Sequence, residues 1–132
     1  MMRLFEAGED LIRFWTERHL ATLTTLRPDG SPHVVPVGVT VDLEARIARV
    51  ICAAGSHKAR NVAWAPDGTA LAAVCQVDGR RWSTLEGRAT VRTDRSAVAE
   101  AERRYSERYR PPRQNPERVV IEIAVTRVLG NQ

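Results

Sequence analysis

Short stretches rich in apolar and β-branched residues alternate along the chain with tight-turn signals, and this rhythm is typical of a small antiparallel β-structure. The segments Arg27–Gly30 (RPDG) and Asp78–Gly79 are typical of tight turns, because proline presets φ and glycine tolerates a positive φ. Pro36 lacks a backbone N–H, which places its stretch at a sheet edge or a bulge. Six strands are expected, over residues 20–26, 33–41, 45–53, 69–77, 81–93 and 118–129.

Three other segments carry helical signals. Leu11, Ile12 and Trp15 share one face of a short amphipathic helix. Ser56 and Asp94 are natural N-caps for two more helices, and the second of these has a solvated face of arginine and glutamate. The helices are expected over residues 10–18, 57–65 and 96–109. These elements predict a mainly β fold, an antiparallel barrel with short flanking helices, and exclude a doubly wound parallel sheet.

The chain has 132 residues and a mass of 14.7 kDa, which is the size of one domain, here residues 1–132. No apolar run approaches the ~20 residues that a membrane helix needs. The opening MMRLFEAGED turns acidic at once and lacks the core of a signal peptide. We therefore expect a cytoplasmic protein that makes no membrane contact.

The cysteines and histidines do not have the spacing of a metal site or a disulfide framework. Cys52 and Cys75 lie in apolar stretches without a CxxC or Cys/His pattern, so we expect two free thiols. His19, His33 and His57 fall in different segments, so we expect no bound metal.

The basic residues are almost all arginine. Nineteen of the twenty are Arg, and Lys58 is the one lysine. The net charge is +4, but residues 1–79 hold eight basic and nine acidic residues, whereas residues 80–132 hold twelve and seven. An acidic partner near the second half is therefore expected. Nucleic acid is not expected, because arginines alternate with glutamates and no aromatic stacking platform is present.

The common catalytic motifs GxSxG, Walker A, GxGxxG and HExxH are absent, and the most informative segment is Gly55–Asn61 (GSHKARN). A helix start presents free N–H groups to anions. Ser56 adds a hydroxyl, Lys58 a charge and Asn61 a neutral donor, and together these groups suit one phosphate. The residues alone leave two interpretations open, a phosphate site and an ordinary capped surface helix.

A second candidate site lies just after the Asp78–Gly79 turn. Trp82 is either a strand tryptophan that fills the core or an aromatic wall over a planar ligand, with Arg80 and Arg81 facing its carboxylates. Arg110 and Arg113 lie in a proline-rich loop, where they either reach an acidic ligand or remain solvated.

The order strand–PDG–strand, strand–GSHKARN–helix and DG–RWSTLEGRA resembles the split β-barrel family of flavin- and deazaflavin-binding oxidoreductases that includes pyridoxamine 5′-phosphate oxidase. Within that family, HLATLTTLRPDGSPHVVPVGVT, QVDGRRWSTLEGRA, RYRPPRQNPERVVIEI and RVLG resemble the branch of biliverdin reductases that depend on coenzyme F420. The likeness spans residues 11–130. It implies a six-stranded split barrel and a homodimer with the cofactor at its interface.

The resemblance also implies residue roles. The cofactor phosphate lies at the start of the helix after the third strand, and Trp82 comes from the partner subunit. The cofactor-binding residues implied are Ser56, His57, Lys58, Asn61, Ile51, Cys52, Pro36, Val37 and Trp82. The arginines expected to bind the substrate are Arg80, Arg81, Arg110 and Arg113. No catalytic side chain is implied, because the hydride comes from the cofactor and solvent can deliver the proton.

The chain departs from the pyridoxamine phosphate oxidases on the second strand. Their arginine and lysine, which grip the phosphate of flavin mononucleotide (FMN), are replaced here by the apolar VVPVGVTV. The resemblance therefore implies F420 rather than FMN, and hydride transfer to a conjugated acceptor, biliverdin giving bilirubin. Two alternatives remain at this point: an FMN-dependent oxidoreductase like pyridoxamine phosphate oxidase, and a non-catalytic carrier of deazaflavin or tetrapyrrole.

Overall fold

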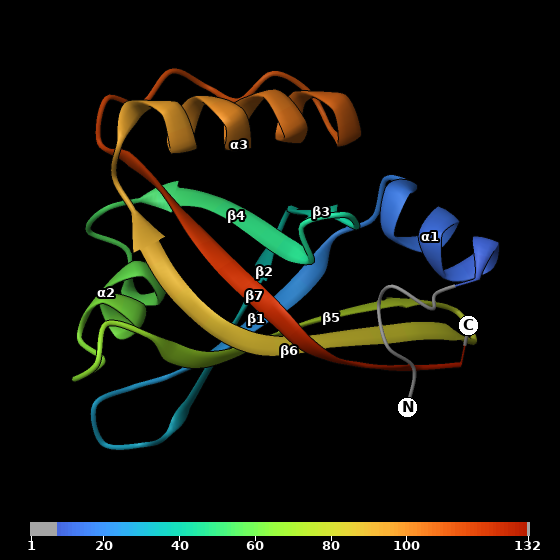
Figure 1. Cartoon of the computed structure of the whole chain (residues 1–132), viewed down its shortest axis with the longest axis horizontal. Helices are drawn as coiled ribbons and strands as arrows, with labels where there is room; N and C mark the ends of the chain where they lie inside the picture. Colours follow the sequence, from blue (N-terminus) through green and yellow to red (C-terminus); the bar gives the residue numbers. More distant parts are fainter. Residues whose placement is uncertain (1–7, 132) are drawn as a thin grey trace.

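The computed structural model describes residues 8–131 (Figure 1). Its strands are β1 (Ala21–Leu26), β2 (Pro32–Val37), β3 (Val39–Asp42), β4 (Ile47–Ala53), β5 (Ala70–Asp78), β6 (Arg81–Arg92) and β7 (Arg118–Gly130). Its helices are α1 (Glu9–Thr16), α2 (His57–Ala63) and α3 (Arg95–Arg108). All strand pairs are antiparallel, in the order β2-β1-β5-β6-β7-β4-β3. The expected mainly β, antiparallel fold class with flanking helices is confirmed.

The sheet closes on itself at Gly38. Strands β2 and β3 lie at opposite ends of the strand order, yet only Gly38 separates them in the chain. In a flat sheet, six spacings of about 4.8 Å would hold those edges about 29 Å apart. The strand ends Val37 and Val39 are two Cα–Cα steps apart and therefore at most about 7 Å from each other, so the sheet curls until the two edges meet.

The seventh strand arises because the stretch expected as one strand over residues 33–41 is broken at Gly38. Two tyrosine rings at the C-terminal end of helix α3 lie against this break. A Cβ at Gly38 would lie 2.8 Å from Tyr105 Cε2 and 3.1 Å from Tyr109 Cε2, so only glycine fits under these rings. The expected tight turns are also present, with Gly30 and Gly79 both at positive φ.

The core fills the inside of the curled sheet. Along β5 and β6, buried side chains alternate with partly or fully exposed ones, as the period of a strand requires. Each fully buried large aliphatic side chain contributes about 1.5–3 kcal/mol. Among those with no exposed surface are Leu23, Val50, Val74, Leu85, Ile121 and Ile123.

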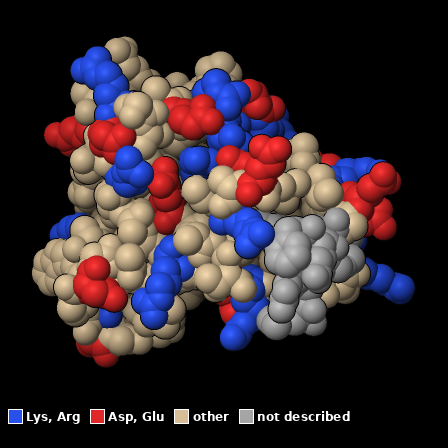
Figure 2. Space-filling model, in the orientation of Figure 1, with Lys and Arg blue, Asp and Glu red and all other residues tan. Residues whose placement is uncertain are grey.

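The two N-caps expected from the sequence are present. The Ser56 hydroxyl accepts a hydrogen bond from the Ala59 N–H (3.4 Å), and the Asp94 carboxylate accepts one from the Ala97 N–H (3.2 Å). Helix α3 lies across one side of the sheet, and its arginines and glutamates mix along the top of the molecule (Figures 1 and 2).

Helix α1 is amphipathic, but its buried face differs by one residue from the expected one. Leu11 and Trp15 are buried, as expected, together with Phe14, whereas Ile12 is 37% exposed. The side chains at i, i+3 and i+4 form the face that meets the core, and Ile12 lies off that face. Trp15 Nε1 donates to Ser83 Oγ (2.9 Å), which ties α1 to β6. Over residues 8–131, no helix is long and apolar enough to cross a membrane.

Candidate cofactor and substrate site

A cavity of about 550 Å³ lies beside the seam at Gly38. Its walls come from the ends of β2 and β4, the start of α2, the C-terminal half of α3 and the loop that follows α3. The lining residues are Pro36, Val37, Gly38, Ile51, Cys52, Ala53, Lys58, Tyr105, Arg110, Pro111, Pro112, Arg113, Asn115 and Arg118.

The cavity is positively charged. Four basic side chains and no carboxylate line it. Arg118 is already paired, because its Nη1 donates to Glu102 Oε2 (2.8 Å) and its Nη2 donates to the Arg113 carbonyl (2.6 Å). Within residues 8–131, Lys58, Arg110 and Arg113 have no hydrogen bond or ion pair through their side chains. Three unneutralised cations around one cavity suit a ligand with several negative charges.

The loop that carries two of these cations is stiffened by its sequence and its contacts. Pro111 and Pro112 fix φ between Arg110 and Arg113. The Arg118 side chain holds the Arg113 carbonyl from the far end of the loop. The arginine backbones are therefore positioned before any ligand arrives.

The opposite wall of the cavity is apolar. It consists of the end of β4, with Ile51 and Cys52, and the end of β2, with Pro36 and Val37. Burial raises the pKa of the Cys52 thiol, although Ser56 and Lys58 act in the other direction. Cys52 is therefore a neutral thiol at neutral pH and part of a wall suited to a flat ring.

Seven of the thirteen residues expected at the site line this cavity together: Pro36, Val37, Ile51, Cys52, Lys58, Arg110 and Arg113. Among the remaining six, Ser56 stands next to the cavity without lining it. Its hydroxyl donates to the Ala53 carbonyl (2.8 Å) and caps α2, so its hydrogen bonds lie within the chain.

His57 and Asn61 turn away from the cavity. Asn61 is buried, and its Nδ2 donates to Thr25 Oγ1 (3.0 Å), so this side chain ties α2 to β1. His57 lies beside the His33 ring, with centroids 5.7 Å apart, and lines a smaller hollow with Asn61 and the exposed Trp64.

Arg80, Arg81 and Trp82 lie at the β5–β6 turn, outside the cavity of their own chain. Arg81 is paired with Glu17 (3.2 Å) and Asp78 (2.5 Å), and its guanidinium lies over the Phe14 ring. The Trp82 side chain is 39% exposed. The placement of Trp82 in the site therefore needs a second copy of the chain, as the family resemblance implies.

The sequence interpretation missed Tyr105, Gly38 and Arg118 at the cavity. Tyr105 and Tyr109 are four residues apart on one helix, a spacing that favours packing over ligand binding. A glycine inside a strand pattern is a signal of close backbone approach, and it could have drawn attention to Gly38. No local pattern separates Arg118, which is paired, from Arg113, which is not.

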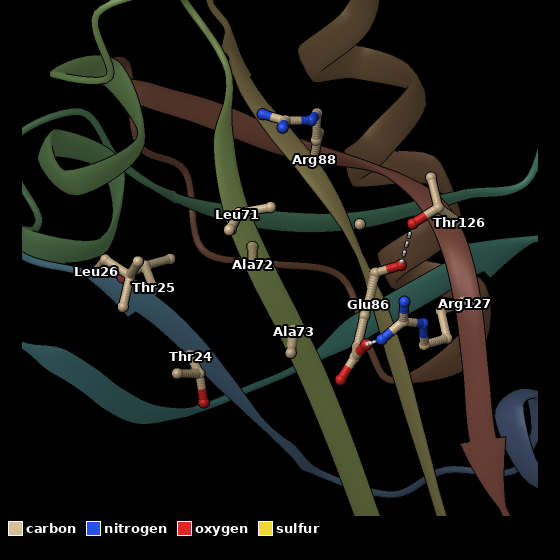
Figure 3. A pocket seen from close by; sticks show the side chains of 11 residues that line it. Thr24, Thr25, Leu26, Leu71, Ala72, Ala73, Glu86, Arg88, Thr126 and Arg127 are labelled. Carbon is tan, nitrogen blue, oxygen red and sulfur yellow. Dashed lines mark hydrogen bonds and ion pairs between the residues drawn. The ribbon is translucent and has the colours of Figure 1, made fainter. Parts of the chain in front are cut away.

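A second hollow of about 470 Å³ lies on the outer face of the sheet (Figure 3). Thr24, Leu26, Leu71 and Ala73 line it from β1 and β5. On the β6–β7 side an ion pair between Glu86 and Arg127 (3.5 Å) borders it. This hollow contains none of the residues expected to bind a cofactor or substrate.

Comparison with known proteins finds a matching family and a relative of similar sequence. The family model described as pyridoxamine 5′-phosphate oxidase matches residues 8–132. The F420H2-dependent biliverdin reductase of Mycobacterium tuberculosis is 57% identical over 124 residues, which cover 94% of this chain and 88% of that protein.

Two solved structures share the fold at lower identity. A conserved hypothetical protein of Mycobacterium tuberculosis superposes with a TM-score of 0.76 at 24% identity, covering 94% of this chain and 84% of that one. A structure described as an F420 reductase has a TM-score of 0.70 at 22% identity, covering 93% and 98%.

Proposed function

The chain belongs to the pyridoxamine 5′-phosphate oxidase family, and from this membership we propose that it is a coenzyme-F420-dependent reductase that acts on biliverdin. The relative at 57% identity is named for that cofactor and that substrate. The observation that carries the proposal is the cavity with three unpaired cations and no lining carboxylate. F420 has a phosphodiester and a glutamate tail, and biliverdin has two propionates, so both ligands need such charges.

The residues present fit this cofactor. Lys58, which is half-buried at the start of α2, would hold the phosphate as a point charge. The ends of β2 and β4 would form the wall against the deazaflavin ring. Strand β2 has no arginine or lysine, so the second half of the phosphate grip expected for FMN is missing. When bound in its reduced form, F420 supplies the hydride.

The chain itself contributes binding, orientation and the exclusion of water. Arg110 and Arg113 would hold the propionates, and the loop that carries them is stiffened before the substrate binds. Ile51 and Cys52 keep water from the apolar wall. Proximity and orientation then supply much of the acceleration. Solvent can deliver the proton to the pyrrole nitrogen, and no side chain is assigned as the acid.

We also propose that the chain is a homodimer joined through the outer faces of β2, β1 and β5. The outward side chains of these three adjacent strands include no charged residue: Pro32, Val34, Pro36, Thr22, Thr24, Leu26, Leu71, Ala73, Cys75 and Val77. Val34, Leu71 and Val77 are each more than half exposed. A continuous uncharged face of this kind is typical of a surface that a partner covers. Pro36 belongs to both this face and the cavity, and the dimer would bring Trp82 of the partner subunit toward the site.

The proposal is tested by mixing the purified protein with reduced F420 and biliverdin and following the return of oxidised F420 and the appearance of bilirubin by absorbance. A parallel reaction uses reduced FMN. We expect turnover with F420 alone. Turnover with FMN instead would favour the FMN enzyme, and F420 binding without turnover would favour a carrier.

The role of Lys58 is tested by the Lys58→Ala variant in a fluorescence titration with F420. Loss of a charged hydrogen bond to phosphate should weaken binding about tenfold or more. Arg60→Ala is the matched control, because Arg60 is an exposed cation on the same helix that does not line the cavity. Equal affinities of the two variants would remove Lys58 from the site.

A further inference from the structure

Tyr105 is the aromatic side chain that lines the charged cavity from within this chain. It lies on α3, five residues before Arg110, so Tyr105, Arg110 and Arg113 reach the cavity from the same side. The strand ends and Lys58, which we assign to the cofactor, form the other walls. Tyr105 therefore stands with the residues assigned to the substrate.

The position of the Tyr105 ring is set by its neighbours. It packs on the Tyr109 ring, with centroids 4.9 Å apart. The Tyr109 hydroxyl is itself anchored, since it donates to the His19 carbonyl (2.6 Å) and accepts from the Val39 N–H (3.1 Å). Gly38 lies so close that a Cβ there would overlap the Tyr105 ring. A ring held on these sides presents its hydroxyl in a defined place.

The two tyrosine hydroxyls differ in one respect. The Tyr109 hydroxyl is fully used within the fold, whereas the Tyr105 hydroxyl makes no hydrogen bond to any residue between 8 and 131. A phenol both donates and accepts hydrogen bonds, and a group of this kind at a cavity wall is free for a ligand.

We infer that the Tyr105 hydroxyl is a substrate-binding group, which donates a hydrogen bond to a lactam oxygen or to the imine-type ring nitrogen of the tetrapyrrole while Arg110 and Arg113 hold its propionates. This inference rests on the proposed function, and it adds an uncharged hydrogen bond to the conjugated ring system of the tetrapyrrole. The charges of Arg110 and Arg113 alone do not discriminate between acidic ligands. A hydrogen bond from Tyr105 favours a ligand that has a carbonyl oxygen or an accepting ring nitrogen within reach of the hydroxyl.

The test compares Tyr105→Phe with the parent protein in two equilibrium titrations, biliverdin followed by its absorbance and F420 followed by its fluorescence. Phenylalanine keeps the ring and its packing, so the melting temperature should stay the same. We expect the biliverdin Kd to rise about five- to tenfold, as for loss of a neutral hydrogen bond. The F420 Kd should not change. Ser106→Ala is the control, because the Ser106 hydroxyl donates to the Glu102 carbonyl and Ser106 does not line the charged cavity.

Each other result overturns the inference in its own way. An unchanged biliverdin Kd in Tyr105→Phe would show that the hydroxyl is not used. A raised F420 Kd with unchanged biliverdin binding would assign the hydroxyl to the cofactor instead. If the parent protein binds F420 but not biliverdin, the proposed substrate fails together with this inference, and that result is distinct from a failure of Tyr105 alone.

Discussion

Lys58 and Arg108 carry the same formal charge in very different surroundings. Arg108 is half-buried, and its guanidinium donates to the Glu17 carbonyl (2.7 Å), the Val39 carbonyl (2.6 Å) and Gln76 Oε1 (2.7 Å). Burial lowers the pKa of Arg108, although a guanidinium stays charged at neutral pH. The charge of Arg108 is thus committed to the fold, whereas that of Lys58 is available to a ligand.

A single residue, His33, makes the free energy of unfolding depend on pH. Its Nδ1 is buried without a hydrogen-bond partner, and burial, followed by the charges of Arg27, His57 and Lys58, lowers its pKa below the usual 6.5. The unfolded chain therefore binds this proton more readily than the folded protein. As a result, His33 has no effect well above pH 6.5 and lowers the free energy of unfolding as the pH falls below 6.5 toward the pKa of the folded state.

We expect the free energy of unfolding to fall as the pH is lowered through 6.5, and the fall to be smaller in His33→Gln. Urea unfolding at a series of pH values measures both. The same pH dependence in His33→Gln and the parent protein would show that other groups cause it.

At the scale of elements, α3 is attached to the rest of the fold by ion pairs from its middle, Arg104 with Asp42 (3.0 Å) and Glu102 with Arg118 (2.8 Å), and by several hydrogen bonds at its C-terminal end. Arg108 reaches the backbone of α1 and β3 and the Gln76 side chain of β5, and the Tyr109 hydroxyl binds at β3 beside Gly38. The exposed face of the helix contributes mainly surface ion pairs, which add little stability.

Arg108→Met should therefore lower the free energy of unfolding by about 2–5 kcal/mol, because several buried acceptors lose their donor. Arg103→Met is the matched control on the same helix. Arg103 is an exposed cation paired with Glu100 and Glu107, and its loss should cost less than about 1 kcal/mol. Urea denaturation midpoints compare the two variants, and equal effects would contradict the fastening role of Arg108.

Local sequence patterns predict most of the fold, because strands, turns and helix caps depend on residues that are neighbours in the chain. Ser56 and Asp94 cap their helices as their positions predict. At Gly38 the sequence offers only the glycine itself as a signal, since apolar alternation continues through it, and the two tyrosines that it contacts are about seventy positions away. The same limit applies to Arg108 and Arg110, which look alike in the sequence and differ only in what the fold places around them.

At the scale of the whole molecule, the uncharged outer face of the sheet leads to a prediction about assembly. The parent protein should be a dimer, and Leu71→Arg should shift it toward the monomer, because the two-fold axis of a dimer would bury a new charge from each subunit in this face. Position 71 lies opposite Arg88 on β6, and the nearby Glu86 is already paired with Arg127. Sedimentation velocity measures the mass of each species.

Ala99→Arg is the control for this prediction, because it adds the same charge at an exposed position on α3, away from the proposed interface. It should leave the dimer intact. A monomeric parent protein, or identical behaviour of the two variants, would contradict the proposed interface.

The place of β7 between β6 and β4 has a consequence for the order in which the molecule is completed. Without β7, the strand order separates into a four-stranded piece, β2-β1-β5-β6, and the hairpin β4-β3. Pro36 and Val37 belong to the first piece, and Ile51 and Cys52 to the second. Until β7 is made, the two pieces are joined only by the chain at Gly38 and by helix and loop segments, without a strand between β6 and β4. Since β7 is the last of the seven strands to be synthesised and Arg118 at its start lines the cavity, the charged cavity is complete only after β7 has paired with both pieces.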